Sequence, residues 1–266
     1  MKEDIKENNI LSKITKTKLQ APIITIYGNP GIGKTSLAAS FPNPLFILTE
    51  NPGKNGLSCT KKYSSFKEIF DDVRELSKID SIPYDTIVLD SIGGLDKLVI
   101  EYIIAEEKDR NGKKKNIALG ECCGGYGKGY ERAQSIHNAF KSVLNRINEK
   151  GIAIIYLAHM GIQEKKSPEH DPYDTYSIMM NHQKSKDVYI NSDIDAVLFY
   201  KLKSYSESLD NGKTRIKCSD QHIIVTSVNE INVSKNRFNM PSEIAIPDAN
   251  SGFKELSKYI PFYNGE

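Results

Sequence analysis

The sequence lacks tryptophan, and it contains only four cysteines among its 266 residues. These residues, Cys59, Cys122, Cys123 and Cys218, form no Cys-x-x-Cys pair, so their spacing supports neither a zinc module nor a disulfide framework. Cys122 and Cys123 are adjacent, and we interpret them as two reduced thiols in a loop. Because tryptophan is absent, any aromatic stacking on a ligand would depend on the 14 tyrosines and 9 phenylalanines.

The sequence also lacks a strong charge imbalance and a long apolar run. A formal net charge of +2 is too small to indicate a nucleic-acid partner, so charged contacts would have to come from local clusters. No apolar run reaches the roughly 20 residues of a membrane span, and the polar start MKEDIKENN has no signal-peptide core. We therefore expect no membrane association and a cytoplasmic location. The length suits one large α/β domain with extensions.

Residues 23–35 read IITIYGNPGIGKT, an apolar strand followed by the spacing Gly-x-x-x-x-Gly-Lys-Thr. Small residues at this spacing let backbone N–H groups close around a polyphosphate, while Lys34 reaches the β- and γ-phosphates of ATP and the Thr35 hydroxyl binds Mg²⁺. A helix beginning near Lys34 would add the positive end of its dipole. The alternative is a tight strand-to-helix turn whose spacing arises by chance. The predicted nucleotide-binding residues are Gly28, Asn29, Pro30, Gly31, Ile32, Gly33, Lys34, Thr35 and Ser36.

Apolar strands alternate with amphipathic helices along the chain. Strands are predicted at 23–27, 45–48, 86–89, 152–158 and 196–200, with further strands or a hairpin within 216–233. Helices are predicted after a Ser65-x-x-Glu68 capping box, at 95–107, and from 130 to a stop at Gly151. This alternation favours a mostly parallel sheet with helices on both faces. We expect an N-terminal arm at 1–20, a core at 21–250 and an extension at 251–266.

Two carboxylates follow apolar strands. Asp90 ends TIVLD, where P-loop enzymes place the carboxylate that holds the Mg²⁺ shell; the alternative is a surface aspartate that caps the next helix. Glu50 ends LFILTE, beside the Asp90 strand if the crossovers are of the usual hand. There it could position a water in line with the γ-phosphate and accept its proton. The alternative is a solvated turn residue, because Asn51-Pro52-Gly53 makes a turn.

Three further residues are candidates for the reaction. His159 ends the strand IIYLAH and could sense the γ-phosphate, or it could be a satisfied core histidine. Lys235 and Arg237 are two cations one residue apart, which on a strand point to the same side. They could reach a phosphate together, in a neighbouring copy if they face outward. The alternative is a solvated basic turn before Pro241.

These residues together resemble the RecA/RadA branch of P-loop ATPases. In that branch the P-loop strand is followed by strands ending in a catalytic glutamate, a metal-site aspartate and a polar sensor, here Glu50, Asp90 and His159. The segment KNRF at 235–238 is similar to the KNRFG segment of bacterial RadA-type proteins, with Asn239 in place of the glycine. The resemblance implies a RecA-like P-loop core in which Lys235 and Arg237 act as fingers toward the next protomer of a ring or filament.

The resemblance is closer still to the phage nucleotide-binding proteins of the Sak superfamily. It rests on YGNPGIGKTSLAASFPNPLFILTEN, IVLDSIGGL, GYGKGYERA, IAIIYLAHM and DAVLFY, and it covers about residues 20–245. Those proteins are minimal RecA-like cores linked to single-strand annealing and phage recombination. The chain lacks the four-cysteine zinc module of RadA, and nothing suggests the separate DNA-binding domain that RecA adds. DNA contacts would therefore have to come from loops.

Two basic loops occupy the positions that line the DNA path in RecA-type cores. Cations together with tyrosines suit sequence-tolerant binding of single-stranded DNA, while the alternative is solvated lysine in flexible loops. Acidic residues in the second loop, such as Glu164 and Asp174, weaken the DNA interpretation there. The predicted DNA-binding residues are Lys108, Arg110, Lys113, Lys114, Lys115, Lys128, Lys184 and Lys186.

The sequence therefore predicts an Mg-ATP-dependent, self-assembling ATPase. Its nucleotide state would control binding or annealing of single-stranded DNA in phage recombination or replication, with a single-strand DNA-binding protein as a further partner. One alternative is a nucleotide-gated scaffold that recruits recombination or replication proteins with little hydrolysis. Another is a helicase-like motor, which the short chain and the lack of an obvious accessory domain weaken.

Overall fold

The computed structural model describes most of the chain from residue 19 onward. Apart from its last two residues, the arm predicted at 1–20 lies outside the described part. No helix in the described part is both long enough and apolar enough to pass through a bilayer. The described residues are 19–53, 55–108, 114, 117–166, 168–169, 171–191, 193–208, 214–248 and 250–265.

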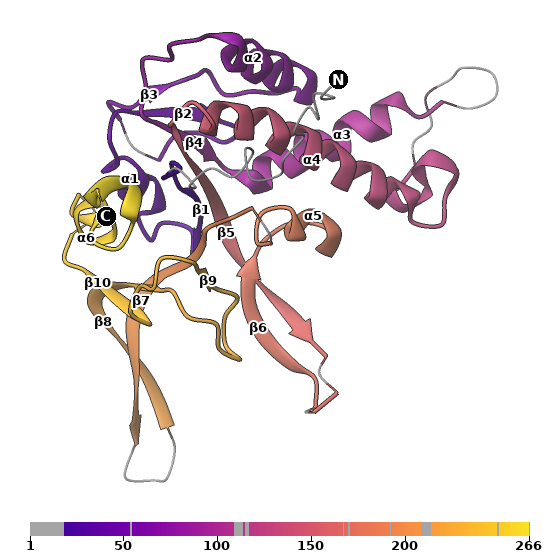
Figure 1. Ribbon diagram of the computed structural model, residues 1–266. Coiled ribbons are helices and arrows are strands. Elements are labelled where there is room, and N and C mark those ends of the chain that lie inside the picture. The colour runs from indigo at the N-terminus through magenta and orange to yellow at the C-terminus, as the bar shows by residue number, and fades with distance from the viewer. Residues whose placement is uncertain are drawn as a thin grey trace, which may run out of the picture.

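A single twisted sheet forms the centre of the molecule (Figure 1). Its strand order is β10-β8-β7-β1-β5-β4-β2-β3, and the strands from β7 to β3 are parallel. This confirms the predicted α/β fold with a mostly parallel sheet. The strands are β1 (Ile23–Gly28), β2 (Pro44–Leu48), β3 (Ser58–Cys59), β4 (Thr86–Asp90), β5 (Ala153–Lys165), β7 (Ala196–Ser208), β8 (Thr214–Val225) and β10 (Glu243–Ile246).

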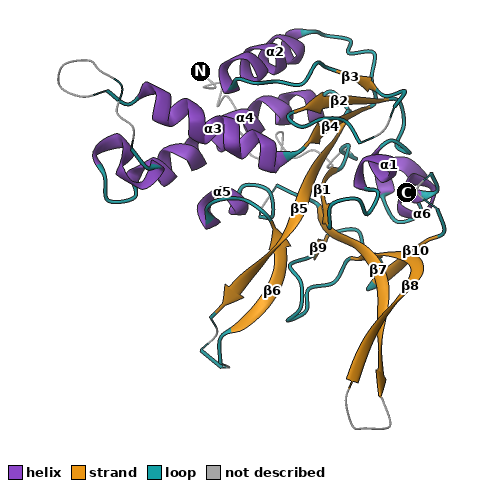
Figure 2. Ribbon diagram, turned by 180° about the vertical axis from the view of Figure 1, so that it is seen from behind, coloured by secondary structure: helices purple, strands orange, loops and turns teal. Residues whose placement is uncertain are grey.

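Helices cover both faces of the sheet, which explains why its strands read as continuous apolar runs (Figures 1 and 2). Two separate hydrophobic clusters result, and β5 contributes to both, with Tyr156 in one and Ile155 and Leu157 in the other. One face carries α2 (Phe66–Lys78), α3 (Ile92–Glu106) and α4 (Lys128–Asn148), and the other carries α1 (Lys34–Ala38), α6 (Gly252–Ser257) and α7 (Pro261–Asn264).

The helix starts differ from prediction because capping is a matter of local geometry. Ser65 precedes α2 as predicted, but its side chain makes no capping hydrogen bond. Ser91 does cap α3, because its hydroxyl accepts from the Gly94 N–H at 3.2 Å, and the helix begins three residues before the predicted start. Helix α4 begins at Lys128, directly after Gly127, which has a positive φ of 78°.

The second predicted basic loop, which contains Glu164 and Asp174, is not a loop but consists largely of regular secondary structure. Strand β5 continues to Lys165 and pairs with antiparallel β6 (Tyr173–Ile178), and a short helix α5 (Gln183–Asp187) follows. Strands β7 and β8 form a second long hairpin. Both hairpins project from the same side of the core (Figures 1 and 2). The outer halves of both hairpins are polar. The apolar pattern that predicts a strand therefore ends where the strands leave the buried core.

The C-terminal segment packs on α1, the helix that follows the P-loop. The Phe253 N–H donates to the Ser40 hydroxyl at 2.8 Å, and the Phe253 ring lies 5.2 Å from the ring of Phe41. Gly252 is in such close contact that an added Cβ would come 2.1 Å from Leu37 Cδ1. The segment therefore closes the second hydrophobic cluster instead of leaving α1 exposed.

A tight turn follows the short strand β9 (Lys235–Asn236), which pairs with the start of β7. The Asn236 carboxamide oxygen accepts from the N–H groups of Phe238 and Met240 at 3.0 and 3.2 Å. Asn239 lies within this turn at a positive φ of 53°. Asparagine tolerates that left-handed conformation better than most residues, so the turn forms without a glycine at this position.

Substitution of Asn239 tests this account of the turn. Asn239→Ala should lower the free energy of unfolding by about 1 kcal/mol, because a Cβ without a compensating polar group is disfavoured in the left-handed region. Asn239→Gly should be neutral or slightly stabilising. Urea denaturation compares both with Asn51→Ala, an exposed position outside the left-handed region. Equal losses in the alanine and glycine variants would show that φ is not the constraint.

Candidate nucleotide-binding site

The predicted P-loop connects β1 to α1 and encloses a pocket of about 300 Å³. Gly31 and Gly33 adopt φ values of 77° and 99°, which only glycine adopts without strain. Gly28 has no room for a side chain, because a Cβ there would come 2.2 Å from the Tyr200 carbonyl oxygen. The glycines of the motif are therefore required by the backbone path and by the close approach of β7.

Lys34 is nearly buried and lies inside the loop. Its ammonium group donates to the carbonyl oxygens of Gly28 and Asn29, both at 2.9 Å. Burial lowers the pKa of Lys34, while the nearby charges of Asp90 and Glu50 oppose that shift. The group is thus held within the cradle by weak neutral partners, which phosphate oxygens could replace.

Thr35 and Asp90 meet as the motif predicts for a magnesium site. The Thr35 hydroxyl donates to Asp90 Oδ2 at 2.9 Å. Burial raises the pKa of Asp90, and the Thr35 hydrogen bond counteracts this shift. A hydroxyl and a carboxylate oxygen suit Mg²⁺, which usually keeps water and phosphate oxygens as its other ligands. Accordingly, no group of three or more histidine, cysteine or acidic side chains that could hold a metal occurs in the described part of the chain.

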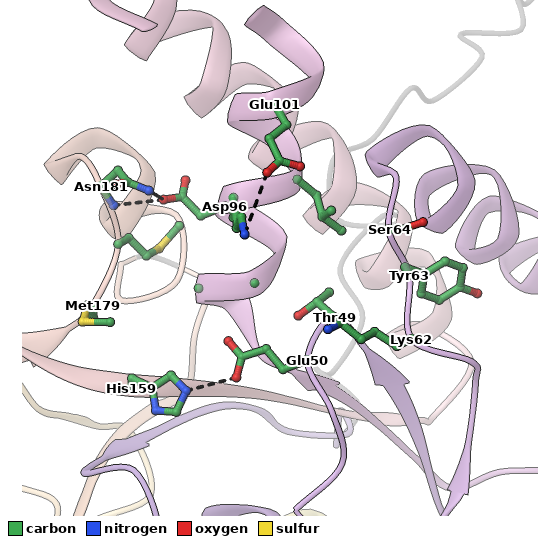
Figure 3. Close-up of a pocket in the computed structure, with 15 residues that line it drawn as sticks. Thr49, Glu50, Lys62, Tyr63, Ser64, Asp96, Glu101, His159, Met179 and Asn181 are labelled. Carbon is green, nitrogen blue, oxygen red and sulfur yellow. Dashed lines mark hydrogen bonds and ion pairs between the residues drawn. The ribbon is translucent and has the colours of Figure 1, made fainter. Parts of the chain in front are cut away.

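Glu50 lies beside Asp90 because β2 pairs with β4, with Leu48 opposite Asp90. One carboxylate oxygen accepts from the Ser91 hydroxyl at 2.6 Å, and the other lies 3.1 Å from His159 Nε2 (Figure 3). The hydrogen bond with His159 is the largest influence that lowers the pKa of Glu50. Glu50 is therefore an ionised carboxylate held on both sides next to the P-loop.

Ser91 and Thr49 are site residues whose roles the sequence did not reveal. The Thr49 hydroxyl donates to the Ser91 carbonyl oxygen at 2.7 Å and accepts from the Ser91 N–H at 2.9 Å. This reciprocal pair fastens the residue before Glu50 to the residue after Asp90. The only sequence signal was a hydroxyl residue beside each carboxylate, and that signal is too common to be specific.

His159 occupies the position expected of a sensor. It is paired with Gly28 across the β1–β5 ladder, at the start of the P-loop. Its Nε2 faces Glu50, whereas its Nδ1 is buried with no hydrogen-bond partner among the described residues. The histidine therefore connects the carboxylate to β5 and to the hairpin beyond.

Lys235 and Arg237 do not join the P-loop of their own chain. Lys235 is paired with Val197 near the start of β7, which lies beside the start of β1, whereas the P-loop follows the end of β1. Lys235 donates to the Asn191 carbonyl oxygen at 3.2 Å, and Arg237 forms an ion pair with Asp195 at 3.3 Å. Both cations thus lie near the N-terminal ends of β1 and β7, whereas the P-loop lies at the C-terminal end of β1.

The predicted DNA-binding cations occupy separate places. Lys108 and Lys114 form an isolated bridge after α3. Lys128 begins α4, and Lys184 of α5 forms an ion pair with Glu131 in the first turn of α4 at 2.9 Å. Lys186 donates to Gln163 Oε1 on β5 at 3.4 Å. Three predicted residues lie outside the described part of the chain, namely Arg110, Lys113 and Lys115.

Comparison with protein families supplies the classification. A family model described as the AAA domain matches residues 20–238. The chain belongs to the AAA domain family. With the geometry above, this membership makes it a P-loop ATPase domain that binds nucleotide. Among solved structures, a KaiC-like protein from the hyperthermophilic archaeon Pyrococcus horikoshii is similar at 10% identity and a TM-score of 0.43, over 87% of this chain and 88% of that one. No curated protein matches the sequence.

Substitution of His159 tests the electrostatics of the site. In His159→Ala the pKa of Glu50 should rise toward its ordinary value, because the largest influence lowering it is removed. A carboxyl whose pKa is lowered on folding stabilises the protein above its unfolded pKa, and this contribution disappears as pH falls through the folded pKa. The wild type should therefore lose stability more steeply in that acidic range than the variant does.

Two measurements check this expectation. NMR titration of the Glu50 carboxyl carbon gives its pKa directly, and urea denaturation across the acidic range gives the stability. His182→Ala, at the cap of α5, serves as the control and should leave the Glu50 pKa unchanged. An unshifted Glu50 pKa in His159→Ala would contradict the assignment.

Proposed function

We propose that this protein hydrolyses ATP with Mg²⁺ and uses its nucleotide state to control binding or annealing of single-stranded DNA in phage recombination or replication. The observation that carries the hydrolytic part is the convergence of Lys34, Thr35, Asp90 and Glu50 at the ends of β1, β4 and β2. An ammonium group, a metal-binding pair and an ionised carboxylate are what phosphoryl transfer to water requires.

Each residue has a defined task in this proposal. Lys34 exchanges the carbonyl oxygens of Gly28 and Asn29 for phosphate oxygens, and Thr35 with Asp90 holds Mg²⁺, which supplies charge neutralisation when bound. Glu50 orients the attacking water and accepts its proton. His159 adjusts the basicity and direction of Glu50 through their hydrogen bond.

The DNA part of the proposal rests on surface chemistry and on the resemblance to the Sak superfamily. Tyr126 is fully exposed at 102%, and it lies two residues before the exposed Lys128 at the start of α4. An aromatic ring beside a cation suits stacking and phosphate contact on a single strand. The proposed setting is the cytoplasm of a host bacterium, with a single-strand DNA-binding protein as a partner.

Self-assembly is the second part of the proposal. Lys235 and Arg237 lie at the sheet edge away from their own P-loop, so they can act on a phosphate only in a neighbouring copy. A head-to-tail ring or filament would bring this edge to the next protomer's nucleotide. Hydrolysis would then depend on assembly.

The scaffold alternative is favoured by one observation. Both carboxylate oxygens of Glu50 are engaged, one by Ser91 and one by His159. With its general base held in this way, the protein would hydrolyse ATP slowly until a partner or DNA releases the Glu50 carboxylate. In that case nucleotide binding, instead of hydrolysis, would carry the biological signal.

ATP turnover with and without single-stranded DNA separates these functions. Turnover should increase with DNA and disappear in Lys34→Ala, which loses the phosphate contact. Glu50→Gln should keep ATP binding and lose about 10²- to 10⁴-fold in turnover, the usual value of a general base. Phosphate release and binding of a fluorescent ATP analogue measure the two quantities. A Glu50→Gln variant with normal turnover would remove Glu50 from the catalytic role.

Mixed assemblies test the trans-acting cations. Arg237→Ala alone should lose about a thousandfold or more in turnover, as for other arginine fingers. Mixing it with Lys34→Ala should restore part of the activity, because the second chain supplies Arg237 to the intact P-loop of the first. The matched control is a mixture in which the second chain carries both substitutions, and it should show no recovery. Full activity of Arg237→Ala alone would exclude the finger role.

A further inference from the structure

A second pocket of about 670 Å³ adjoins the nucleotide pocket. It lies between the first turns of α3, the segment 62–64 and the segment 179–181 (Figure 3). Glu50 and His159 line both pockets and are hydrogen-bonded to each other. This pair is therefore the wall between the nucleotide and whatever occupies the second pocket.

The interior of the second pocket offers flat apolar surfaces. Gly93 and Gly94 expose the backbone of α3, and Gly94 cannot carry a side chain because a Cβ would come 2.3 Å from Thr49 Oγ1. Next to them, Met179 is 53% exposed although it is apolar, and Leu98 adds a buried aliphatic surface. A polarizable thioether beside an exposed backbone surface suits an aromatic ring, and the volume is that of a small-molecule site.

The pocket lining carries two lysines and three acidic residues, and one of the acidic residues, Glu101, lies with the lysines at the rim, where its side chain is 57% exposed. Lys62 and Lys97 are exposed at the rim, and Lys97 has only a loose, exposed contact with Glu101 at 3.9 Å. Inside, Glu50 and Asp96 are acidic, which disfavours an anionic group at depth. A ligand with a neutral ring and an anionic end fits this arrangement, with the ring inside and the anion at the rim.

The wall formed by 179–181 is firmly held and is connected to the catalytic pair. The Asn181 N–H and side-chain amide both donate to Asp96 Oδ2, at 2.9 and 2.7 Å. Asp96 Oδ1 lies 3.0 Å from Nε2 of the fully buried His137. The Met179 N–H donates to the His159 carbonyl oxygen at 2.8 Å. A displacement of this wall would therefore be transmitted to His159.

We propose that the second pocket binds one unstacked nucleotide of single-stranded DNA, with the base against Met179 and Gly93 and the phosphate between Lys62 and Lys97. This rests on the proposed function, and it adds the place where DNA contacts the catalytic machinery. A base in the pocket touches the Glu50–His159 wall from the side opposite the γ-phosphate. DNA occupancy thereby alters the hydrogen bonds that restrain Glu50. The rate of ATP hydrolysis can then respond to DNA through direct contact, because the DNA site and the catalytic site share these two residues.

Charge and shape variants test the proposal by DNA affinity. Lys62→Ala/Lys97→Ala should reduce the salt dependence of binding by a log–log slope of about 0.7, since the two lysines share one phosphate and each neutralised phosphate of a single strand contributes about 0.7. Met179→Ala should weaken binding by about 2- to 10-fold through the lost thioether–ring contact. The matched control, Lys67→Ala/Lys78→Ala on α2, removes the same charge from exposed positions outside this pocket and should change neither quantity.

The measurements are fluorescence anisotropy with a labelled oligodeoxythymidine over a range of salt, and the ratio of ATP turnover with and without that oligonucleotide. Gly93→Leu provides a variant without a charge change, because a Cβ there has ordinary contacts of 3.5 Å and longer. It should block the pocket and lower both the DNA affinity and the turnover ratio. Binding of a fluorescent ATP analogue confirms that each variant is folded.

The outcomes are distinguishable. If the wild type binds DNA and the Lys62/Lys97, Met179 and Gly93 variants bind it with unchanged affinity and salt slope, the pocket inference is wrong and the proposed function stands. If the wild type hydrolyses ATP but binds no DNA at any salt concentration, both the DNA function and the pocket inference fail. Protection of the pocket by a protein partner in place of DNA would also overturn the inference, in favour of the scaffold.

Discussion

The register of four parallel strands sets the position of nearly every polar group in the site. His159 is opposite Gly28 across β1 and β5, Leu157 is opposite Asp90 across β5 and β4, and Leu48 is opposite Asp90 across β4 and β2. A slip of one residue would turn each side chain to the other face of the sheet. Both faces are packed by helices, so such a slip would bury polar groups and expose apolar ones. The hydrophobic clusters therefore fix the catalytic geometry as well as the fold.

The electrostatics of the site follow from the close approach of its charged side chains. Lys34, Asp90 and Glu50 share a small pocket at one edge of the sheet. Burial lowers the pKa of Lys34 and raises the pKa of Asp90, and each of these charges offsets the cost of the other. Glu50 differs because its two hydrogen bonds favour the ionised form. A site in this balance gains most from a ligand that brings both negative phosphates and a divalent cation.

Residues that combine a local motif with a strand end could be predicted from the sequence. The P-loop, Asp90 and Glu50 belong to this class, because parallel strands bring their ends to a common edge. The Thr49–Ser91 pair could not be predicted, since it joins two strands through hydroxyl groups that carry no distinctive pattern. The β5–β6 hairpin was missed for a related reason. Its outer half is exposed, so no alternation of apolar residues marks it.

The same hairpins suggest why this P-loop is built so tightly. Strands β5 and β7 flank β1, and both continue past the P-loop into hairpins that leave the core (Figure 1). On one side His159 lies beside Gly28, and on the other the Tyr200 carbonyl leaves no space for a Cβ at that glycine. The loop is thus in van der Waals contact with the bases of both projecting elements. Since tightly packed backbones leave little room for displacement, these contacts on both sides hold the start of the P-loop in one conformation.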